Sequence, residues 1–318
     1  NENIKGKVTS VFPNSTSSAV PTLMTGLSPQ EHGMTAWYMH SREFASQIIP
    51  LPYVPRFKGV DLGNLLEINK LFNLKSLTNR LKLKPYVVLN KKIVNSRFTK
   101  ACARKSKRKK YSTISNYFQT IKKTINSNKQ RKFIFCYYGE LDGICHDKGS
   151  TSKQALKHFK ELSKKLSSFI KSIKGTHTTL IITADHGETE VHKSKRINLK
   201  DHPKLRDTLV FPLCGEHRFA YCYVKLSKEK EFENYVKTKL KHCCDLFKSE
   251  DLLKKGYFGK FKVHKELKNR IGDYTLIMKD HYGIYDWLDY KKKNHYNLGD
   301  HGGLSDDELY VPIIVINP

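Results

Sequence analysis

The sequence lacks long apolar runs. No stretch of its 318 residues approaches the ~20 consecutive apolar residues that a membrane-spanning helix needs. Paired Cys-x-x-Cys motifs are absent as well, which argues against a zinc ribbon, and no internal repeat is visible. Hydrophobic residues make up 38% of the chain and charged residues 28%. This is the composition of a globular protein that can form one large domain or two smaller ones.

Acidic residues are scarce relative to basic ones. The chain has 30 Asp and Glu against 58 Lys and Arg, which gives a formal net charge of +28. A basic surface concentrates anions such as phosphate esters, nucleic acid or an acidic membrane. Lysine is spread over the whole chain, so we interpret most of the charge as a solvated surface. The run at residues 100–110 contains no aromatic side chains, so it favours an exposed cap or linker over a nucleic-acid platform.

Cysteines are few and irregularly spaced. Cys136 lies in an apolar run and Cys222 alternates within another, so most of them are predicted to be small core residues. This usage favours a reducing, cytoplasmic compartment. The chain has no initiator Met, so a targeting segment ahead of it stays an open alternative. The seven cysteines are Cys102, Cys136, Cys145, Cys214, Cys222, Cys243 and Cys244.

Short apolar runs predict the strands of an α/β fold. Residues 152–173 carry apolar side chains at helical spacing and lie between two apolar runs that are predicted to be buried strands. A strand, a long helix and a second strand predict a βαβ unit in a parallel sheet covered by helices. The predicted strands are at residues 5–13, 133–138, 178–183, 220–224 and 311–316.

Other segments are predicted to be helical or irregular. Residues 17–25 suit a helix that ends near Gly26. Residues 45–60 contain three prolines and predict an irregular, partly extended loop. Residues 62–81 show apolar positions at helical spacing, and residues 227–286 are predicted to be mostly helical.

Metal-competent side chains follow two of the predicted strands and recur near the chain end. Ligand sites in open α/β sheets lie outside the carboxyl ends of the strands, and carboxylate with imidazole suits zinc or manganese. A single Asp-His pair is usually a surface turn, whereas three such sites together predict a metal centre. Gly187, Gly302 and Gly303 are expected to let the backbone approach a metal or phosphate. The sites are Asp142 with His146, Asp185 with His186, and Asp300 with His301.

A hydroxyl-rich stretch precedes the first predicted helix. Ser15, Thr16, Ser17 and Ser18 are all candidate nucleophiles, because backbone N–H groups at a helix start favour phosphate oxygens. The N–H groups near Ser17 are expected to hold such oxygens. Taken alone, the stretch is equally typical of an ordinary helix cap.

Together these motifs resemble those of the type I phosphodiesterase / nucleotide pyrophosphatase family, a branch of the alkaline phosphatase superfamily. The resemblance implies an α/β fold with a central, mostly parallel sheet flanked by helices on both faces. It also implies a single catalytic domain over residues 1–318, with peripheral insertions near 60–130 and 227–286. The matching positions are Phe12-Pro13, Thr16, Thr25-Gly26-Leu27, Pro29, His32-Gly33, Asp142, His146, Ala184 to Gly187, and His301.

The resemblance implies two divalent metal ions, zinc in the first instance and manganese as the alternative. The family's second set of ligands includes one further Asp at the end of its first strand. No candidate for that Asp precedes Phe12, so we expect the family's first strand to be missing from this chain. The implied ligands are Asp142, His146 and His301 in one set, and Asp185, His186 and Thr16 in the other.

The implied activity is metal-dependent hydrolysis of phosphate esters. Phosphodiesters or nucleotide pyrophosphates, as small molecules, are the expected substrates, cleaved through a phospho-threonine intermediate on Thr16. The alternatives are a phosphomonoesterase or phosphonate hydrolase of the same superfamily, or a non-catalytic relative that binds polyanions. Nucleic acid is a less favoured partner. A sulfatase is disfavoured because no Cys/Ser-x-Pro-x-Arg motif lies near Thr16. Tyr38, His40 and Tyr53 are candidates for a leaving-group pocket.

Overall fold

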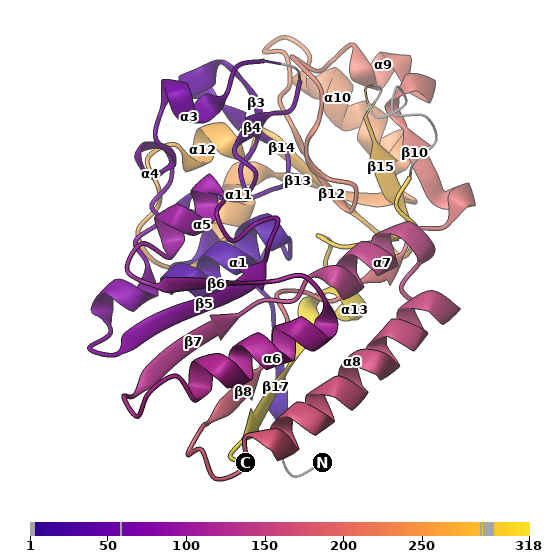
Figure 1. Ribbon diagram of the computed structural model, residues 1–318. Helices are drawn as coiled ribbons and strands as arrows, with labels where there is room; N and C mark the ends of the chain where they lie inside the picture. The colour runs from indigo at the N-terminus through magenta and orange to yellow at the C-terminus, as the bar shows by residue number, and fades with distance from the viewer. Residues whose placement is uncertain (1–3, 58, 287, 289–295) are drawn as a thin grey trace.

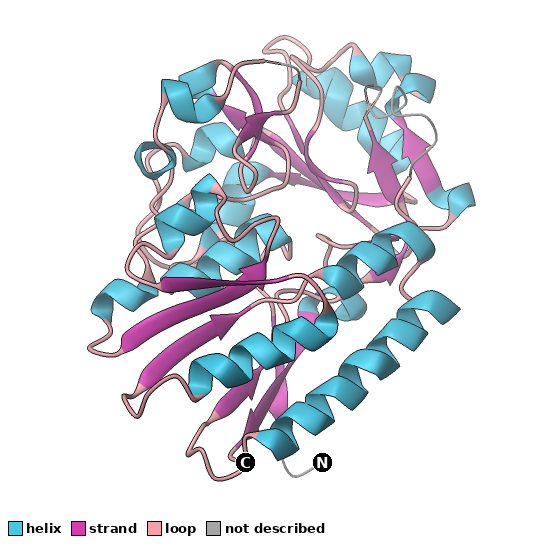
Figure 2. Cartoon of the chain, viewed as in Figure 1, coloured by secondary structure: helices cyan, strands magenta, loops and turns pink. Residues whose placement is uncertain are grey.

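The computed structural model describes residues 4–57, 59–286, 288 and 296–318. Helices and strands are interspersed from β1 (Ile4–Thr9) to β17 (Tyr310–Ile316), as Figures 1 and 2 show. All seven cysteines fall within the described residues, and all are free thiols, six of them buried. The expected role of most cysteines as core residues is therefore confirmed. None of the described helices has the length and apolar character required to cross a membrane.

A three-stranded parallel sheet has β5 (Lys84–Asn90) at its centre. It pairs in parallel with β6 (Lys107–Tyr111) on one side and with β7 (Lys132–Cys136) on the other. α5 (Arg97–Cys102) and α6 (Ile114–Ile125) form the connections. Residues 60–130 were expected to contain a peripheral insertion. Instead, they supply two of the three strands.

Helices cover both faces of β5. On one face, Val88 packs in a cluster with side chains of α6 and α8 (Lys153–Ser172). On the other face, Val87 and Leu89 pack in a cluster with α5 and α1 (Thr16–Thr25). A strand buried on both faces reads as a continuous apolar run, as the β5 sequence does. The layers are seen in Figure 1.

The predicted helix at 152–173 matches α8 closely. The predicted parallel pairing of the strands before and after it is not found among the described residues, where β7 pairs with β5 and β8 (Leu180–Ile182) pairs with β17. After β7 the chain forms α7 (Glu140–Lys148), α8 and β8. Within the described residues β8 pairs antiparallel with β17, which in turn pairs antiparallel with β1. β8 is not fully buried either. Ile181 is 66% exposed while its two neighbours are half-buried, because only one face of this strand is covered.

A second, antiparallel sheet lies in the upper part of Figure 1. Its order is β11 (Cys214–Glu216), β12 (Phe219–Cys222), β14 (Tyr274–Met278) and β13 (Cys244–Lys248). The prediction of a mostly helical segment at 227–286 is wrong, because β13, β14 and β15 (Gly283–Tyr285) lie within it. Short apolar runs such as Tyr-Thr-Leu-Ile-Met do not distinguish a buried strand from a helix by periodicity alone.

The basic run at 100–110 contains the edge strand β6, so its expected role as a cap or linker is wrong. Lys107 to Lys110 are all exposed. Positive charges on an edge strand hinder pairing with another chain, which is a common protection of sheet edges.

The remaining helices and strands are short. Residues 62–81 form two single-turn helices and a 3-10 turn instead of one helix, and residues 45–60 contain two short strands. The short helices and strands of the whole chain are β2 (Met39–Ser41), β3 (Ser46–Ile49), β4 (Val54–Pro55), α2 (Pro29–His32), α3 (Leu62–Leu65), α4 (Ile68–Leu71), β9 (Thr189–Glu190), β10 (Arg196–Asn198), α9 (Pro203–Arg206), α10 (Glu229–Tyr235), α11 (Ser249–Lys254), α12 (Leu267–Arg270), β16 (Gly299–Asp300) and α13 (Asp306–Leu309).

Candidate active site

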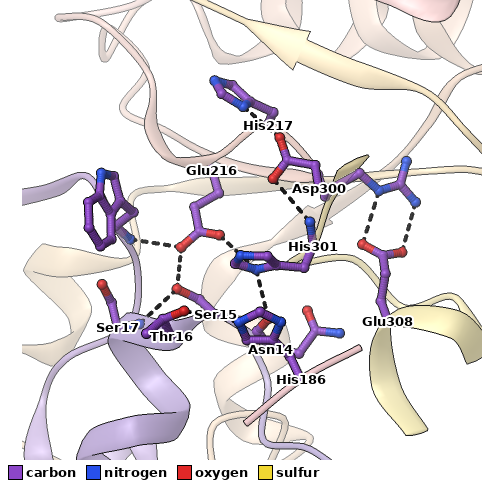
Figure 3. Close-up of polar contacts among 12 residues, drawn as sticks. Asn14, Ser15, Thr16, Ser17, His186, Glu216, His217, Asp300, His301 and Glu308 are labelled. Carbon is purple, nitrogen blue, oxygen red and sulfur yellow. Dashed lines mark hydrogen bonds and ion pairs between the residues drawn. The ribbon is translucent and has the colours of Figure 1, made fainter. Parts of the chain in front are cut away.

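Thr16 is the first residue of α1, and its surroundings distinguish it from the neighbouring hydroxyls. Ser15, Ser17 and Ser18 are each 0% exposed, whereas Thr16 is partly exposed. The Ser15 hydroxyl caps the helix by accepting from Ser17 N–H at 3.1 Å, and it donates to Glu216. The Ser17 N–H is therefore already bonded, contrary to the expectation that it holds phosphate oxygens. Among the four hydroxyls, Thr16 is the one that is not fully buried. Figure 3 shows it next to Ser15 and Ser17 at the start of the helix.

Asp185 and His186 lie beside Thr16, directly after β8. The Thr16 hydroxyl oxygen is 3.0 Å from His186 Nε2, and Asp185 Oδ2 is 3.6 Å from the same nitrogen. Tyr137, just after β7, donates from its hydroxyl to Asp185 Oδ2 at 3.3 Å. The structure thus brings together the three residues of the second implied ligand set.

Asp142, His146 and His301 meet next to this group. Asp142 and His146 are one helical turn apart on α7, which places Asp142 Oδ1 3.3 Å from His146 Nε2. His301 follows β16 and brings its Nε2 to 3.8 Å from the same oxygen. The rings of His301 and His186 stack at 3.7 Å between centroids, which joins the two groups.

The three histidines are anchored in the same way, with Nδ1 next to a backbone carbonyl and Nε2 facing the site. Nδ1 of each ring lies at hydrogen-bond distance from a backbone carbonyl: Gly187 O at 2.9 Å for His186, Gly299 O at 2.8 Å for His146 and Asn14 O at 3.1 Å for His301. A carbonyl only accepts, so Nδ1 carries the proton and the lone pair of a neutral ring is on Nε2. Each Nε2 faces a carboxylate or the Thr16 hydroxyl. Histidines that bind metals are usually anchored in this way through their second nitrogen.

The electrostatics favour a cation at this point. Burial, followed by the neighbouring His186 and His146 rings, lowers the pKa of His301 to about 3, so this ring is neutral. Burial opposes protonation of His146, but the Asp142 carboxylate, 3.3 Å from Nε2, and the charge of Asp300 raise its pKa to about 11. The site thus attracts positive charge to His146, and a metal ion supplies such charge by displacing the proton.

The buried oxygen Asp142 Oδ1 provides a test of whether a metal fits. It has no hydrogen-bond partner, although a buried carboxylate oxygen normally needs one. Among the described residues, two groups of side chains have metal-ligand spacing: one contains Asp142, His146, Glu188 and His301, and the other contains Glu216, Asp300 and His301. The first group includes one complete implied ligand set. Neither group includes Asp185 or His186.

Sequence reasoning missed Glu216, an acidic residue that contacts His301. Glu216 Oε2 is 3.3 Å from His301 Nδ1, while its other oxygen accepts from Ser15 and from Trp37 N–H at 3.1 Å. Asp300 was assigned no separate role. Its carboxylate is paired with His217 Nδ1 at 2.7 Å. Glu216 lies on the edge strand β11, far away in sequence, and no local motif marks it. Figure 3 shows its carboxylate between Ser15 and His301.

The three glycines make close contacts with protein atoms. A Cβ on Gly187 would lie 1.9 Å from the backbone oxygen of Asp307. A Cβ on Gly302 would meet the Phe219 ring at 2.7 Å. These close contacts within the protein already explain why glycine occupies these positions, without the expected approach of a metal or phosphate.

The pocket candidates separate into different environments. Tyr53 is 1% exposed and donates to Leu66 O at 2.7 Å, so it is a core residue. His40 stacks on Phe211 with 4.9 Å between ring centroids. Tyr38 pairs through its backbone with Gly215, next to Glu216.

Solved structures of three proteins resemble this chain. An inactive form of murine ectonucleotide pyrophosphatase / phosphodiesterase 5, in complex with AMP, is 18% identical with a TM-score of 0.67, and the match covers 96% of this chain and 78% of that one. The human protein of the same name is 19% identical with a TM-score of 0.69, and the match covers 98% and 79%. Phosphonoacetate hydrolase from Sinorhizobium meliloti 1021, in complex with phosphonoformate, is 16% identical with a TM-score of 0.63, and the match covers 97% and 80%. This likeness confirms the alkaline-phosphatase-like fold.

The sequence itself matches a protein family. The profile of the type I phosphodiesterase / nucleotide pyrophosphatase family matches residues 1–48 and 74–304, which is most of the chain. A search of curated proteins finds no match. The family match makes the protein a hydrolase of the phosphodiesterase / nucleotide pyrophosphatase type and confirms the resemblance in the motifs. The chain belongs to the type I phosphodiesterase / nucleotide pyrophosphatase family.

Proposed function

We propose that this protein hydrolyses phosphodiesters or nucleotide pyrophosphates in a metal-dependent reaction, with Thr16 as the nucleophile. The observation that carries the proposal is the shared orientation of His146, His186 and His301, whose Nε2 atoms converge on Asp142 and Thr16. Asp142, His146 and His301 would hold one divalent ion, and Asp185, His186 and Thr16 would contribute to a second. Zinc and manganese both suit these ligands.

In the proposed reaction Thr16 acts on phosphorus. Bound divalent ions lower the pKa of a coordinated hydroxyl and offset the negative charge of the phosphoryl group. The Thr16 oxygen forms a bond to phosphorus as the bond to the leaving oxygen breaks, which gives a phospho-threonine. Water then attacks phosphorus and breaks its bond to the Thr16 oxygen, which regains a proton, and the phosphate monoester is released. His186, 3.0 Å from the Thr16 oxygen, fixes the orientation of that oxygen.

The similar structures support a small substrate that carries a phosphate or phosphonate group. The murine relative is in complex with AMP and the bacterial one with phosphonoformate. The first favours a nucleotide substrate. The second keeps a phosphonate hydrolase as the alternative function at the same site.

The proposal is tested by hydrolysis of a chromogenic phosphodiester and of the matching monoester, with zinc or manganese and again after chelation. We expect the diester to be preferred and chelation to stop turnover. Preference for the monoester would make the protein a phosphatase, and turnover of a phosphonate alone would favour the alternative. Salt-dependent binding of nucleic acid with no turnover of any of these substrates would contradict an enzymatic role.

Substitution of the nucleophile gives a sharper test. Thr16→Ala should lower kcat by at least about 1,000-fold, since it removes the attacking oxygen. Thr16→Ser keeps a hydroxyl and should retain measurable activity and a phosphorylated peptide in mass spectra. Ser18→Ala is the matched control, because Ser18 is buried in the same helix turn. Near-normal turnover by Thr16→Ala would exclude Thr16 as the nucleophile.

A further inference from the structure

Glu188 brings a second carboxylate to the candidate metal centre. It lies two residues after His186 in the loop that leads to β9. One of its carboxylate oxygens belongs to a set of ligand atoms, one each from Asp142, His146, Glu188 and His301, that all lie within 4.8 Å of one another. Four ligands arranged tetrahedrally at about 2.0–2.2 Å from one ion lie about 3.3–3.6 Å apart. The four ligand atoms would therefore have to move together by at most about 1.5 Å to bind one ion, which side-chain rotation can provide.

Both oxygens of the Glu188 carboxylate are buried and have no hydrogen-bond partner. The same is true of Asp142 Oδ1, which faces the same centre. Two buried carboxylates in contact are strongly unfavourable unless a proton or a cation lies between them.

The surrounding backbone makes room for this carboxylate. A Cβ on Gly299 would lie 2.7 Å from Glu188 Oε2, so only glycine leaves space for the side chain here. The carbonyl oxygen of Gly299 also anchors His146 Nδ1 at 2.8 Å. One backbone position thus accommodates Glu188 and orients a metal-competent histidine.

Glu190 provides an internal contrast. Its carboxylate Oε1 accepts from Thr151 N–H at 2.8 Å, from the Thr151 hydroxyl at 3.0 Å and from Ser150 at 3.1 Å. It therefore has the hydrogen bonds of an ordinary structural carboxylate, which Glu188 lacks.

We propose that Glu188 is a fourth protein ligand of the divalent ion that Asp142, His146 and His301 hold. This inference rests on the proposed function, because it concerns the metal centre of that site. Two imidazoles and two carboxylates form a four-coordinate set whose negative charge balances a divalent cation, and such a set suits zinc, manganese or cobalt. Glu188 would then keep this ion in place independently of the substrate.

Metal binding by the chelator-treated protein tests the assignment without measuring activity. Zn²⁺ affinity would be measured by competition with a chromophoric chelator, and Co²⁺ binding by visible absorption. Asp142→Asn should abolish Zn²⁺ binding at this site. Glu188→Gln should lower the Zn²⁺ affinity of the same site by about 100-fold or more, since even the loss of a residue that only supports a ligand lowers metal affinity 10–100-fold. It should also change the Co²⁺ spectrum. Glu188→Asp, which withdraws the carboxylate by one methylene, should give an intermediate affinity.

Glu190→Gln is the matched control and should leave both readouts unchanged. Circular dichroism of each variant confirms that it folds. Unchanged Zn²⁺ affinity and an unchanged Co²⁺ spectrum in Glu188→Gln, with metal lost in Asp142→Asn, would overturn the role of Glu188 and leave the proposed metal centre standing. Unchanged metal binding in Asp142→Asn as well would overturn the metal centre itself.

Discussion

At the scale of single residues, His32 shows how this fold uses a neutral histidine for structure. Its Nδ1 accepts from Met34 N–H at 3.1 Å, and its Nε2 lies 3.2 Å from Ser18 O and 3.1 Å from the Thr22 hydroxyl. Both nitrogens are thereby occupied inside the protein. His32 connects the loop after α2 to α1, the helix that begins with Thr16.

Acid should destabilise the protein through His32. Burial lowers its pKa from 6.5 to about 3. Between these values the unfolded chain binds a proton that the folded protein does not, so stability falls as the pH drops below about 6.5. We expect this group to contribute a loss of roughly 2–3 kcal/mol between pH 6.5 and pH 4.5. Urea unfolding with a chelator present, at several pH values, measures the loss.

His32→Asn removes the titrating group and keeps an acceptor for Met34 N–H. The variant should be less stable at pH 7 but should show a shallower decline toward pH 4.5. His177→Asn is the control, since His177 is exposed. Equal slopes for the wild type and His32→Asn would show that His32 is not the source of the acid sensitivity.

At the scale of elements, α13 braces both loops that carry the candidate ligands. Glu308 accepts from Gly303 N–H at 2.8 Å, and its backbone oxygen accepts from Gly187 N–H at 2.9 Å. The Glu308 carboxylate also forms a bidentate pair with Arg218 at 3.0 and 2.9 Å, and both side chains are 0% exposed. Glu308 thus holds the residue after His186 through its backbone and the loop after His301 through its paired carboxylate.

Glu308→Gln should destabilise the protein by about 3–5 kcal/mol, because it leaves the buried Arg218 without a counter-charge. The free energy of unfolding in urea is the measurement. Glu250→Gln is the control, because Glu250 forms only exposed pairs with Lys254 and Lys268, and it should change stability by less than about 1 kcal/mol. A similarly small effect of Glu308→Gln would show that the pair does not brace the loops.

Elements with strong local signals were predictable from the sequence. The helix at 17–25 was predictable, because Ser15 caps its start and Gly26, with φ at 70°, ends it. The segment at 227–286 was not predictable, since its strands depend on pairing with residues far away along the chain: β14 pairs with β12 and with β13, and β15 pairs with β10. The basic run was misassigned for a similar reason, because only its pairing with β5 makes it a strand.

At the scale of the whole molecule, the candidate site draws on residues 14 to 301. The motifs named the six residues of the implied ligand sets, and the fold brings these six side chains close together. They were insufficient for Glu216 and for the carbonyl of Asn14, because a side chain or carbonyl that supports a ligand has no sequence pattern of its own. Glu188 was overlooked despite its place two residues after His186, since its burial against Asp142 is evident only in the folded chain.

Because the ligands are brought together only by folding, metal binding should stabilise the whole chain. A ligand present at 100 times its dissociation constant adds about 2.7 kcal/mol per site when the unfolded chain does not bind it. Removal of metal should therefore lower the Tm by several degrees, at about 2–4 °C per kcal/mol in larger domains. Differential scanning calorimetry with zinc and with excess chelator measures this difference. Asp142→Asn should show a clearly smaller difference between the two conditions, because it removes the gain from the ion that this carboxylate would hold and leaves the second ligand set intact. A chelator effect of full size in that variant would place the stabilising metal elsewhere in the protein.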